Sequence, residues 1–203
     1  MFGKSVFSTI LAKYAEKRKI KTLLADFDNW SSINTIFNIN KYTGHETNIS
    51  FNLDILDRTN IRNGETNQNA DIYNLLNERR KEYELLIIDT ALSEQNEQLK
   101  LLLEYSNKIV FLMEPNILEI KKANSILETY IKDWNINMDK IKIVFNKTNN
   151  NAIIEDILRQ AFSEIEIVGS IPYNEKFNLY IDKKTNEKIK ITDLEKIYNK
   201  IRS

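Results

Sequence analysis

The sequence predicts an α/β fold, in which helices cover both faces of a mostly parallel β-sheet. Short apolar runs suited to strands alternate with amphipathic segments along the chain, and this alternation is typical of βα units. Most of the apolar runs are continuous, as in strands that are buried on both faces. A length of 203 residues suits one domain with a substantial core, so we expect a single domain over residues 1–203.

The expected elements follow from the spacing of apolar residues. Phe7, Ile10, Leu11 and Tyr14 recur at intervals of three and four residues, which indicates an amphipathic helix. Patterns of this kind predict helices over residues 5–17, 71–82, 95–103, 116–134, 152–162 and 192–201. Apolar or alternating runs predict strands over residues 22–27, 49–56, 85–88, 109–113, 141–145 and 165–168. The polar stretch over residues 38–64 is expected to be loop apart from its one strand.

Composition excludes several classes of protein. Lys+Arg and Asp+Glu balance at 29 each, so net charge gives no attraction to nucleic acid or to an anionic membrane. The absence of cysteine removes disulfides, cysteine-held iron–sulfur clusters and thiol nucleophiles. The one histidine, His45, is expected on a surface loop, which argues against histidine triads and multi-histidine metal sites. No run reaches the roughly 20 apolar residues of a membrane span, and no signal peptide is visible. We therefore expect a cytoplasmic protein without a membrane partner.

Four polar residues lie at the ends of predicted strands: Asp26, Asp28, Asp89 and Asn146. Ligands of parallel sheets bind beyond the carboxyl ends of the strands, so this convergence predicts a site. Alternation sends Asp26 and Asp28 to the same side. Asp89 directly follows four apolar residues, where it can accept Mg²⁺-bound water. Asn146 offers a donor and an acceptor to the edge of a base.

Gly3-Lys4-Ser5 is the only segment that could form a phosphate loop, because the chain has just 4 glycines. At the start of a helix, the Ser5 hydroxyl can bind Mg²⁺ and Lys4 can reach the β- and γ-phosphates of a nucleotide. The tripeptide matches the end of the pattern G-x-x-x-x-G-K-[ST], whose first half the sequence lacks.

Each candidate also has a purely structural interpretation. Ser5 would cap the first helix, and Lys4 would be solvated. The aspartates at positions 26 and 28 would be solvated loop residues. Asp89 would cap a following helix, and Asn146 would form a turn with the asparagines that come after it.

Taken in order, these motifs resemble the ParA/MinD family of deviant phosphate-loop ATPases, in particular its CpaE-like pilus-assembly relatives. The resemblance covers nearly the whole chain. Its motifs are Gly3-Lys4-Ser5, residues 24–28 followed by Ser31-Ser32-Ile33-Asn34, residues 83–91, Val144-Phe145-Asn146-Lys147 and residues 169–174.

The resemblance implies a three-layer P-loop fold that binds ATP and Mg²⁺. Catalysis would rest on Lys4 and Asp28, with Asp28 positioning the hydrolytic water. The cofactor-binding residues would be Gly3, Lys4, Ser5, Val6, Asn146, Pro172 and Tyr173, and the metal-binding residues would be Ser5, Asp26 and Asp89. The resemblance also implies a homodimer around two ATP molecules, released by hydrolysis, that positions plasmids, division proteins or envelope machinery.

Three departures from the family pattern bear on activity. The pattern K-G-G-x-G-K-[ST]-T begins with a signature lysine, which no residue here matches. The strand before the loop is also absent, so we expect the natural start to lie upstream. Val6 stands where the family usually has Thr. Leu92-Ser93 stand where the family usually has a glycine in switch II, the segment that contains Asp89 in this chain. We therefore expect ATPase activity only if the phosphate loop is completed upstream.

Two alternatives to a switch ATPase stay open. One is a non-catalytic adaptor that keeps the fold and binds a protein partner. The other is non-specific DNA binding through the basic cluster of Lys13, Lys17, Arg18, Lys19 and Lys21, although overall neutrality weakens it. The final helix, residues 192–201, is expected to pack on the core, because its basic face is too weak to favour a membrane surface.

Overall fold

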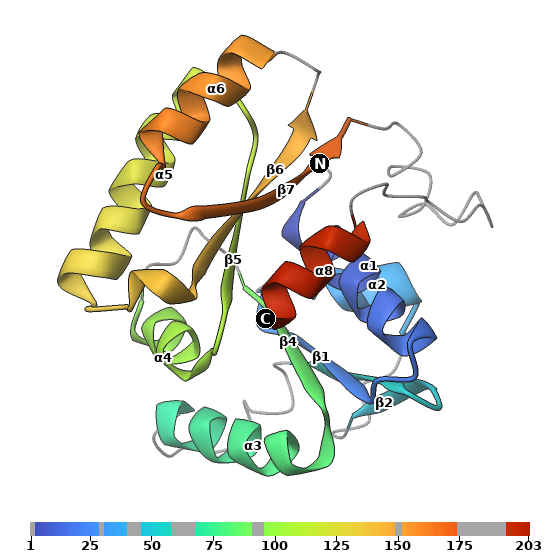
Figure 1. Ribbon diagram of the computed structural model, residues 1–203. Coiled ribbons are helices and arrows are strands. Elements are labelled where there is room, and N and C mark those ends of the chain that lie inside the picture. Colours follow the sequence, from blue (N-terminus) through green and yellow to red (C-terminus); the bar gives the residue numbers. More distant parts are fainter. Residues whose placement is uncertain are drawn as a thin grey trace. The chain divides into compact units, whose positions relative to one another are not determined.

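The computed structural model describes residues 3–28, 31–39, 46–57, 68–90, 96–148, 152–173 and 194–203 (Figure 1). The chain divides into two compact units. The first contains residues 1–102 and 177–187, and the second contains residues 103–176 and 188–203. We describe each unit by itself.

The first unit is built on a four-stranded sheet with the order β2-β3-β1-β4. Its strands are β1 (Thr22–Asp26), β2 (Thr47–Ser50), β3 (Leu53–Asp57) and β4 (Leu85–Asp89). The central strand β1 is parallel to both β3 and β4, whereas β2 is antiparallel to β3. Every residue of β1 is buried, as expected for an apolar strand that is covered on both faces.

Helix α1 (Lys4–Lys17) is the main packing element of this unit. It contacts β1, β3, β4 and α2 (Ser32–Phe37). Small residues such as Ala12 and Ala15 are fully buried along it, which allows a close approach to the sheet. Helix α1 and the strands β1 and β4 therefore belong to the same packed unit.

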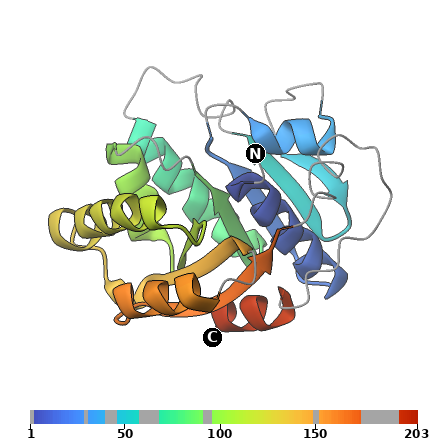
Figure 2. The ribbon, with the colours of Figure 1, turned by 90° about the horizontal axis from the view of Figure 1, so that it is seen from above.

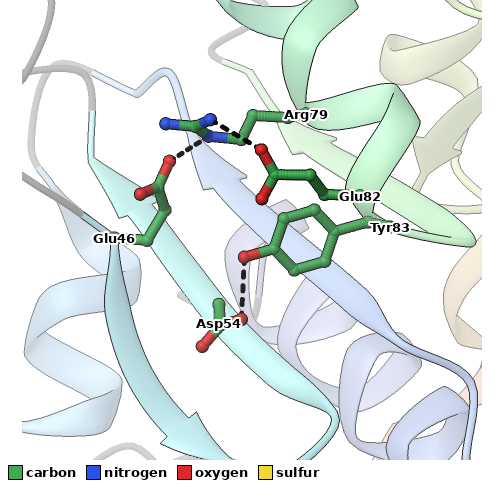
Figure 3. Close-up of polar contacts among 5 residues, drawn as sticks. All are labelled: Glu46, Asp54, Arg79, Glu82 and Tyr83. Carbon is green, nitrogen blue, oxygen red and sulfur yellow. Dashed lines mark hydrogen bonds and ion pairs between the residues drawn. The ribbon is translucent and has the colours of Figure 1, made fainter.

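A polar network ties α3 (Gln68–Glu82) to the β2–β3 hairpin (Figure 3). The Arg79 guanidinium forms ion pairs with Glu46 and with Glu82. The Tyr83 hydroxyl donates to Asp54 Oδ2 at 2.7 Å. Burial and the hydrogen bond to Asp54 raise the pKa of Tyr83 above its usual value. The network adds polar contacts to the apolar packing of α3, whose Ile72 and Leu76 are buried.

The second unit is built on a parallel three-stranded sheet with the order β5-β6-β7. Its strands are β5 (Ile109–Met113), β6 (Ile141–Thr148) and β7 (Glu166–Pro172). Helices α5 (Ile117–Glu128) and α6 (Ala152–Ala161) contact each other and are coloured yellow-green and orange in Figure 2. Helix α5 continues into a π-helical turn, Thr129–Asp133. Helix α4 (Glu97–Tyr105) spans the boundary between the two units.

Helix α8 (Leu194–Arg202) packs on β7. Its apolar face is buried, and Ile197 is completely inaccessible. A Cβ at Gly169 would lie 2.5 Å from Ile197 Cγ1, so only glycine allows this close approach. The structure thus confirms that the last helix packs on the core, because its apolar residues are not available to a membrane surface.

The α/β class with mostly parallel sheets and surrounding helices is confirmed, and the expectation for residues 49–56 is wrong. Residues 49–56 were expected to form one strand, but Phe51 and Asn52 form a turn between β2 and β3. The segment Ser31-Ser32-Ile33-Asn34 leads into a helix that the apolar spacing did not reveal. The single-domain assignment stays a prediction.

One more expectation concerns membrane spans. Among the described residues, no helix is long and apolar enough to cross a bilayer.

Candidate functional site

Three aspartates form a row at the carboxyl ends of adjacent parallel strands in the first unit. Asp57, Asp26 and Asp89 are the last residues of β3, β1 and β4, and they are register partners. All three are buried. Because adjacent parallel strands lie about 4.8 Å apart, three carboxyl groups crowd one edge of the sheet. Such crowding disfavours full ionisation unless donors or a cation compensate it.

The start of α1 supplies donors to this edge. Gly3 is the N-cap residue in an extended conformation, and no side chain caps the helix. The interpretation of Ser5 as a helix cap is therefore wrong. Ser5 and Lys4 instead lie close enough to Asp89 to lower the pKa of its carboxyl group, against the larger effect of burial. The structure thus brings Lys4, Ser5 and Asp89 together, as the motif predicts.

Asp89 has one oxygen satisfied and one without a partner. Ser8 Oγ donates to Asp89 Oδ1 at 3.0 Å, whereas Oδ2 is buried with no hydrogen bond among the described residues. Burial raises the pKa of Asp89, and the hydroxyls of Ser5 and Ser8 oppose the shift. The alternative of Asp89 as a helix cap is wrong, since Asn96 Oδ1 accepts from Leu99 N at the start of α4.

Asp26 holds the loop that follows β1. Its Oδ1 accepts from Asp28 N at 3.0 Å, and its Oδ2 accepts from Ile33 N at 2.9 Å. Burial raises the pKa of Asp26 to about 7, against these two backbone donors, and the nearby charges of Asp89 and Asp57 add to the rise. The interpretation of Asp26 as a solvated loop residue is wrong, because it is buried.

Asp28 lies at the half-buried turn between β1 and α2. Its Oδ2 accepts from Ser32 Oγ at 3.2 Å, and its backbone oxygen accepts from Ser31 N. Ser31 has a φ of 46°, in the left-handed region. Asp28 is close enough to Asp89 to act on its titration. The carboxylate expected to position water therefore shares this edge with Lys4 and Ser5.

The residues at this edge fit a Mg²⁺ ion that keeps most of its water. Mg²⁺ is usually bound by one or two carboxylates together with phosphate oxygens and water. The unpartnered Asp89 Oδ2 and the Ser5 hydroxyl offer such a donor pair. Asp26 is the weaker candidate, because both its oxygens already accept backbone hydrogen bonds. No group of three or more acidic or histidine side chains among the described residues forms a metal cluster, and the metal assignments stay predictions.

The second unit carries the other predicted site residues. Strand β6 runs to Thr148, so Asn146 lies inside the strand and is 3% exposed. The expectation that it follows the strand is wrong, and so is its turn role. The register of β6 and β7 shifts between Asn146 and Thr148, and Lys147 has a φ of 56°. Pro172 ends β7, and Tyr173 is 54% exposed beyond it.

Two residues, Asp57 in the aspartate row and Ser8 beside it, escaped the sequence analysis, and Asn34 was named only as part of a motif. Asp57 lay within a segment interpreted as one strand followed by loop. Asn34 Nδ2 donates to Asp57 Oδ2, a contact between α2 and β3. Ser8 occupies a helix position without a motif signal. The only sequence signal available was the Asp-terminated apolar run Leu53–Asp57, which resembles the run before Asp89.

The remaining expectations concern the basic cluster, Val6, and residues outside the described ranges. Lys17, Arg18 and Lys19 are exposed. Lys21 Nζ lies 4.8 Å from the centre of the Tyr83 ring. DNA binding through this cluster stays a prediction. Val6 is buried, while His45 and Leu92-Ser93 lie outside the described residues.

Comparisons with known proteins identify a family and several similar structures. The family described as the CobQ/CobB/MinD/ParA nucleotide binding domain matches residues 2–186. The chain belongs to this family. No curated protein sequence matches it.

Solved structures resemble the whole chain at low sequence identity. A ParA family ATPase from Chlorobium tepidum TLS has a TM-score of 0.79 at 16% identity, covering 99% of this chain and 94% of that one. A plasmid partition protein from Borrelia burgdorferi B31 bound to AMPPNP has a TM-score of 0.78 at 19% identity, covering 98% and 92%. The MinC:MinD cell division protein complex from Aquifex aeolicus gives 0.78 at 14% identity, covering 100% and 91%. These TM-scores establish a shared fold.

Proposed function

We propose that this chain binds ATP with Mg²⁺ and acts as a nucleotide-dependent dimerisation switch. Its role would be the positioning or partition of DNA, pilus or envelope machinery in the cytoplasm. The observation that carries the proposal is the pairing of the Gly3-Lys4-Ser5 helix start with Asp89. Ser5 and Lys4 lie close enough to Asp89 to lower its pKa, and one buried oxygen of Asp89 has no hydrogen-bond partner among the described residues. The partition protein that was solved with AMPPNP supports nucleotide as the ligand class.

The residues would divide the work as follows. Lys4, at the positive end of the α1 dipole, would hold phosphate oxygens. Ser5 and Asp89 would hold Mg²⁺, which supplies charge neutralisation between the phosphates when bound. Asp28 would orient the attacking water, held in place by its hydrogen bond from Ser32.

The remaining assignments belong to the second unit and to the assembly. The edge of the adenine would contact Asn146, Pro172 and Tyr173, an assignment that rests on the family resemblance. The homodimer rests on the same resemblance. The MinC:MinD complex supports a further protein partner. A CpaE-like role in pilus assembly is the narrowest form of the proposal.

Calorimetry with ATP and Mg²⁺ tests the proposal on two forms of the protein. One form is the 203-residue chain, and the other extends it through the upstream reading frame. Binding is expected in the extended form and should be weakened in Lys4→Ala. The matched control is Lys17→Ala, an exposed lysine at the other end of α1, which should bind as wild type does. Silence of both forms would refute the proposal.

Dimerisation is tested by sedimentation velocity with AMPPNP and Mg²⁺. A shift from monomer to dimer on nucleotide addition is expected, and an unchanged sedimentation coefficient contradicts the switch.

A non-catalytic adaptor is the second candidate function. The buried Val6, which stands where the family usually has Thr, favours it. The adaptor would keep the fold and bind its protein partner without nucleotide. Rapid ATP hydrolysis by the 203-residue chain, abolished in Asp28→Ala, would refute it.

A further inference from the structure

Ser8 contacts the same carboxyl group that the proposed function assigns to the metal. Its hydroxyl donates to Asp89 Oδ1 at 3.0 Å, across 81 positions of sequence. Ser8 lies three residues after Ser5 on α1, so the two hydroxyls share one face of the helix. Helix α1 contacts β4, which ends at Asp89. The hydrogen bond thus joins the phosphate-loop helix to the last residue of the strand.

This hydrogen bond leaves the carboxyl group asymmetric. Oδ1 has a donor, and Oδ2 is buried without one among the described residues. A buried acceptor without a partner destabilises a protein, because the lost hydration of the oxygen is not replaced. A ligand that donates a hydrogen bond to Oδ2 removes this penalty, and a water bound to Mg²⁺ is such a ligand.

A purely structural role for Ser8 would look different. A serine inside a helix commonly bonds to the carbonyl oxygen four residues before it, and this contact would leave Asp89 free to rotate. Thr9 illustrates the contrast, because its hydroxyl is buried with no hydrogen-bond partner among the described residues. The Ser8 hydroxyl instead donates its hydrogen bond to the Asp89 carboxylate.

We propose that Ser8 is a positioning residue, which fixes the Asp89 carboxylate so that Oδ2 stays available to Mg²⁺-bound water. The inference rests on the proposed function and adds to it a residue outside the phosphate-loop motif. Outer contacts of this kind typically change metal affinity by about 10- to 100-fold. Removal of the Ser8 hydroxyl should therefore act on the metal and not on ATP itself.

The first test uses nucleotide-free protein. Ser8→Ala should lower the urea midpoint in the wild-type background and leave it unchanged in an Asp89→Ala background, because the partner is then gone. Thr9→Val is the matched control, since it removes the neighbouring buried hydroxyl, and its effect should be the same in both backgrounds. Equal effects of Ser8→Ala in the two backgrounds would overturn the inference.

The second test measures ATP affinity by calorimetry in Mg²⁺ and in EDTA, in whichever form of the protein binds ATP. Ser8→Ala should reduce the Mg²⁺-dependent gain in affinity by about 10-fold or more, with affinity in EDTA unchanged. Ser8→Thr, which keeps the hydroxyl, should restore the gain. An unchanged gain in Ser8→Ala overturns the inference alone. Silence of wild type in both forms overturns the proposed function, and the inference with it.

Discussion

The raised pKa of Asp26 predicts a specific pH dependence of stability. Asp26→Asn removes the titrating carboxyl group and keeps one acceptor oxygen for the backbone donors at Asp28 and Ile33. In the native protein the pKa of Asp26 is about 7, compared with 3.8 in the unfolded chain. Between these values the native state holds a proton that the unfolded state has released. The free energy of unfolding of the wild type therefore falls as pH rises through this window.

The magnitude follows from the two pKa values. A difference of about 3 pH units corresponds to a total of roughly 4 kcal/mol. Between pH 5 and pH 8 the linkage relation gives a loss of about 2.5 kcal/mol from this one group. The asparagine lacks the titration, so the advantage of wild type over the variant should shrink by that amount from pH 5 to pH 8. A lost backbone hydrogen bond costs the variant about 1 kcal/mol at every pH.

Urea unfolding at pH 5, 6, 7 and 8 measures this difference. Asp89, whose pKa is also raised by burial, contributes to both proteins and cancels from the comparison to first order. Glu78→Gln removes an exposed carboxyl group on α3 and serves as the control. Parallel stability curves for wild type and Asp26→Asn would refute the reasoning, because they would mean that the burial of Asp26 does not affect its ionisation.

Three further predictions concern single contacts. Lys4→Ala should weaken ATP binding by roughly 10- to 100-fold, the value of a charge-assisted contact with phosphate, as calorimetry would measure. Gly169→Ala should destabilise the protein by about 1–3 kcal/mol, since the new Cβ overlaps Ile197; urea unfolding with an unchanged midpoint would contradict this close approach. Tyr83→Phe should cost about 1 kcal/mol through the lost bond to Asp54, and a value near zero in the same assay would show that water replaces it.

Local sequence patterns predicted most of the helices and strands. In the candidate site they indicated Lys4, Ser5, Asp26 and Asp89, but not Asp57 or Ser8. The continuous apolar runs before Asp26 and Asp89 predicted β1 and β4, because a strand buried on both faces excludes polar residues. The Gly3-Lys4-Ser5 tripeptide predicted the helix start beside them. By contrast, the hairpin turn at Phe51-Asn52 carries no Gly or Pro, so Asn52 gave only a weak turn signal.

The sequence by itself determined the fold class, the family and the identity of the motif residues, since periodicity and spacing are local properties. Only the tertiary structure decided which side chains meet. It placed Asp57 in the row with Asp26 and Asp89 through strand register. It also joined Ser8 to Asp89 across 81 residues and buried Asn146 within β6. Contacts between distant segments depend on the register and packing of whole elements, and neither is written in any short stretch of sequence.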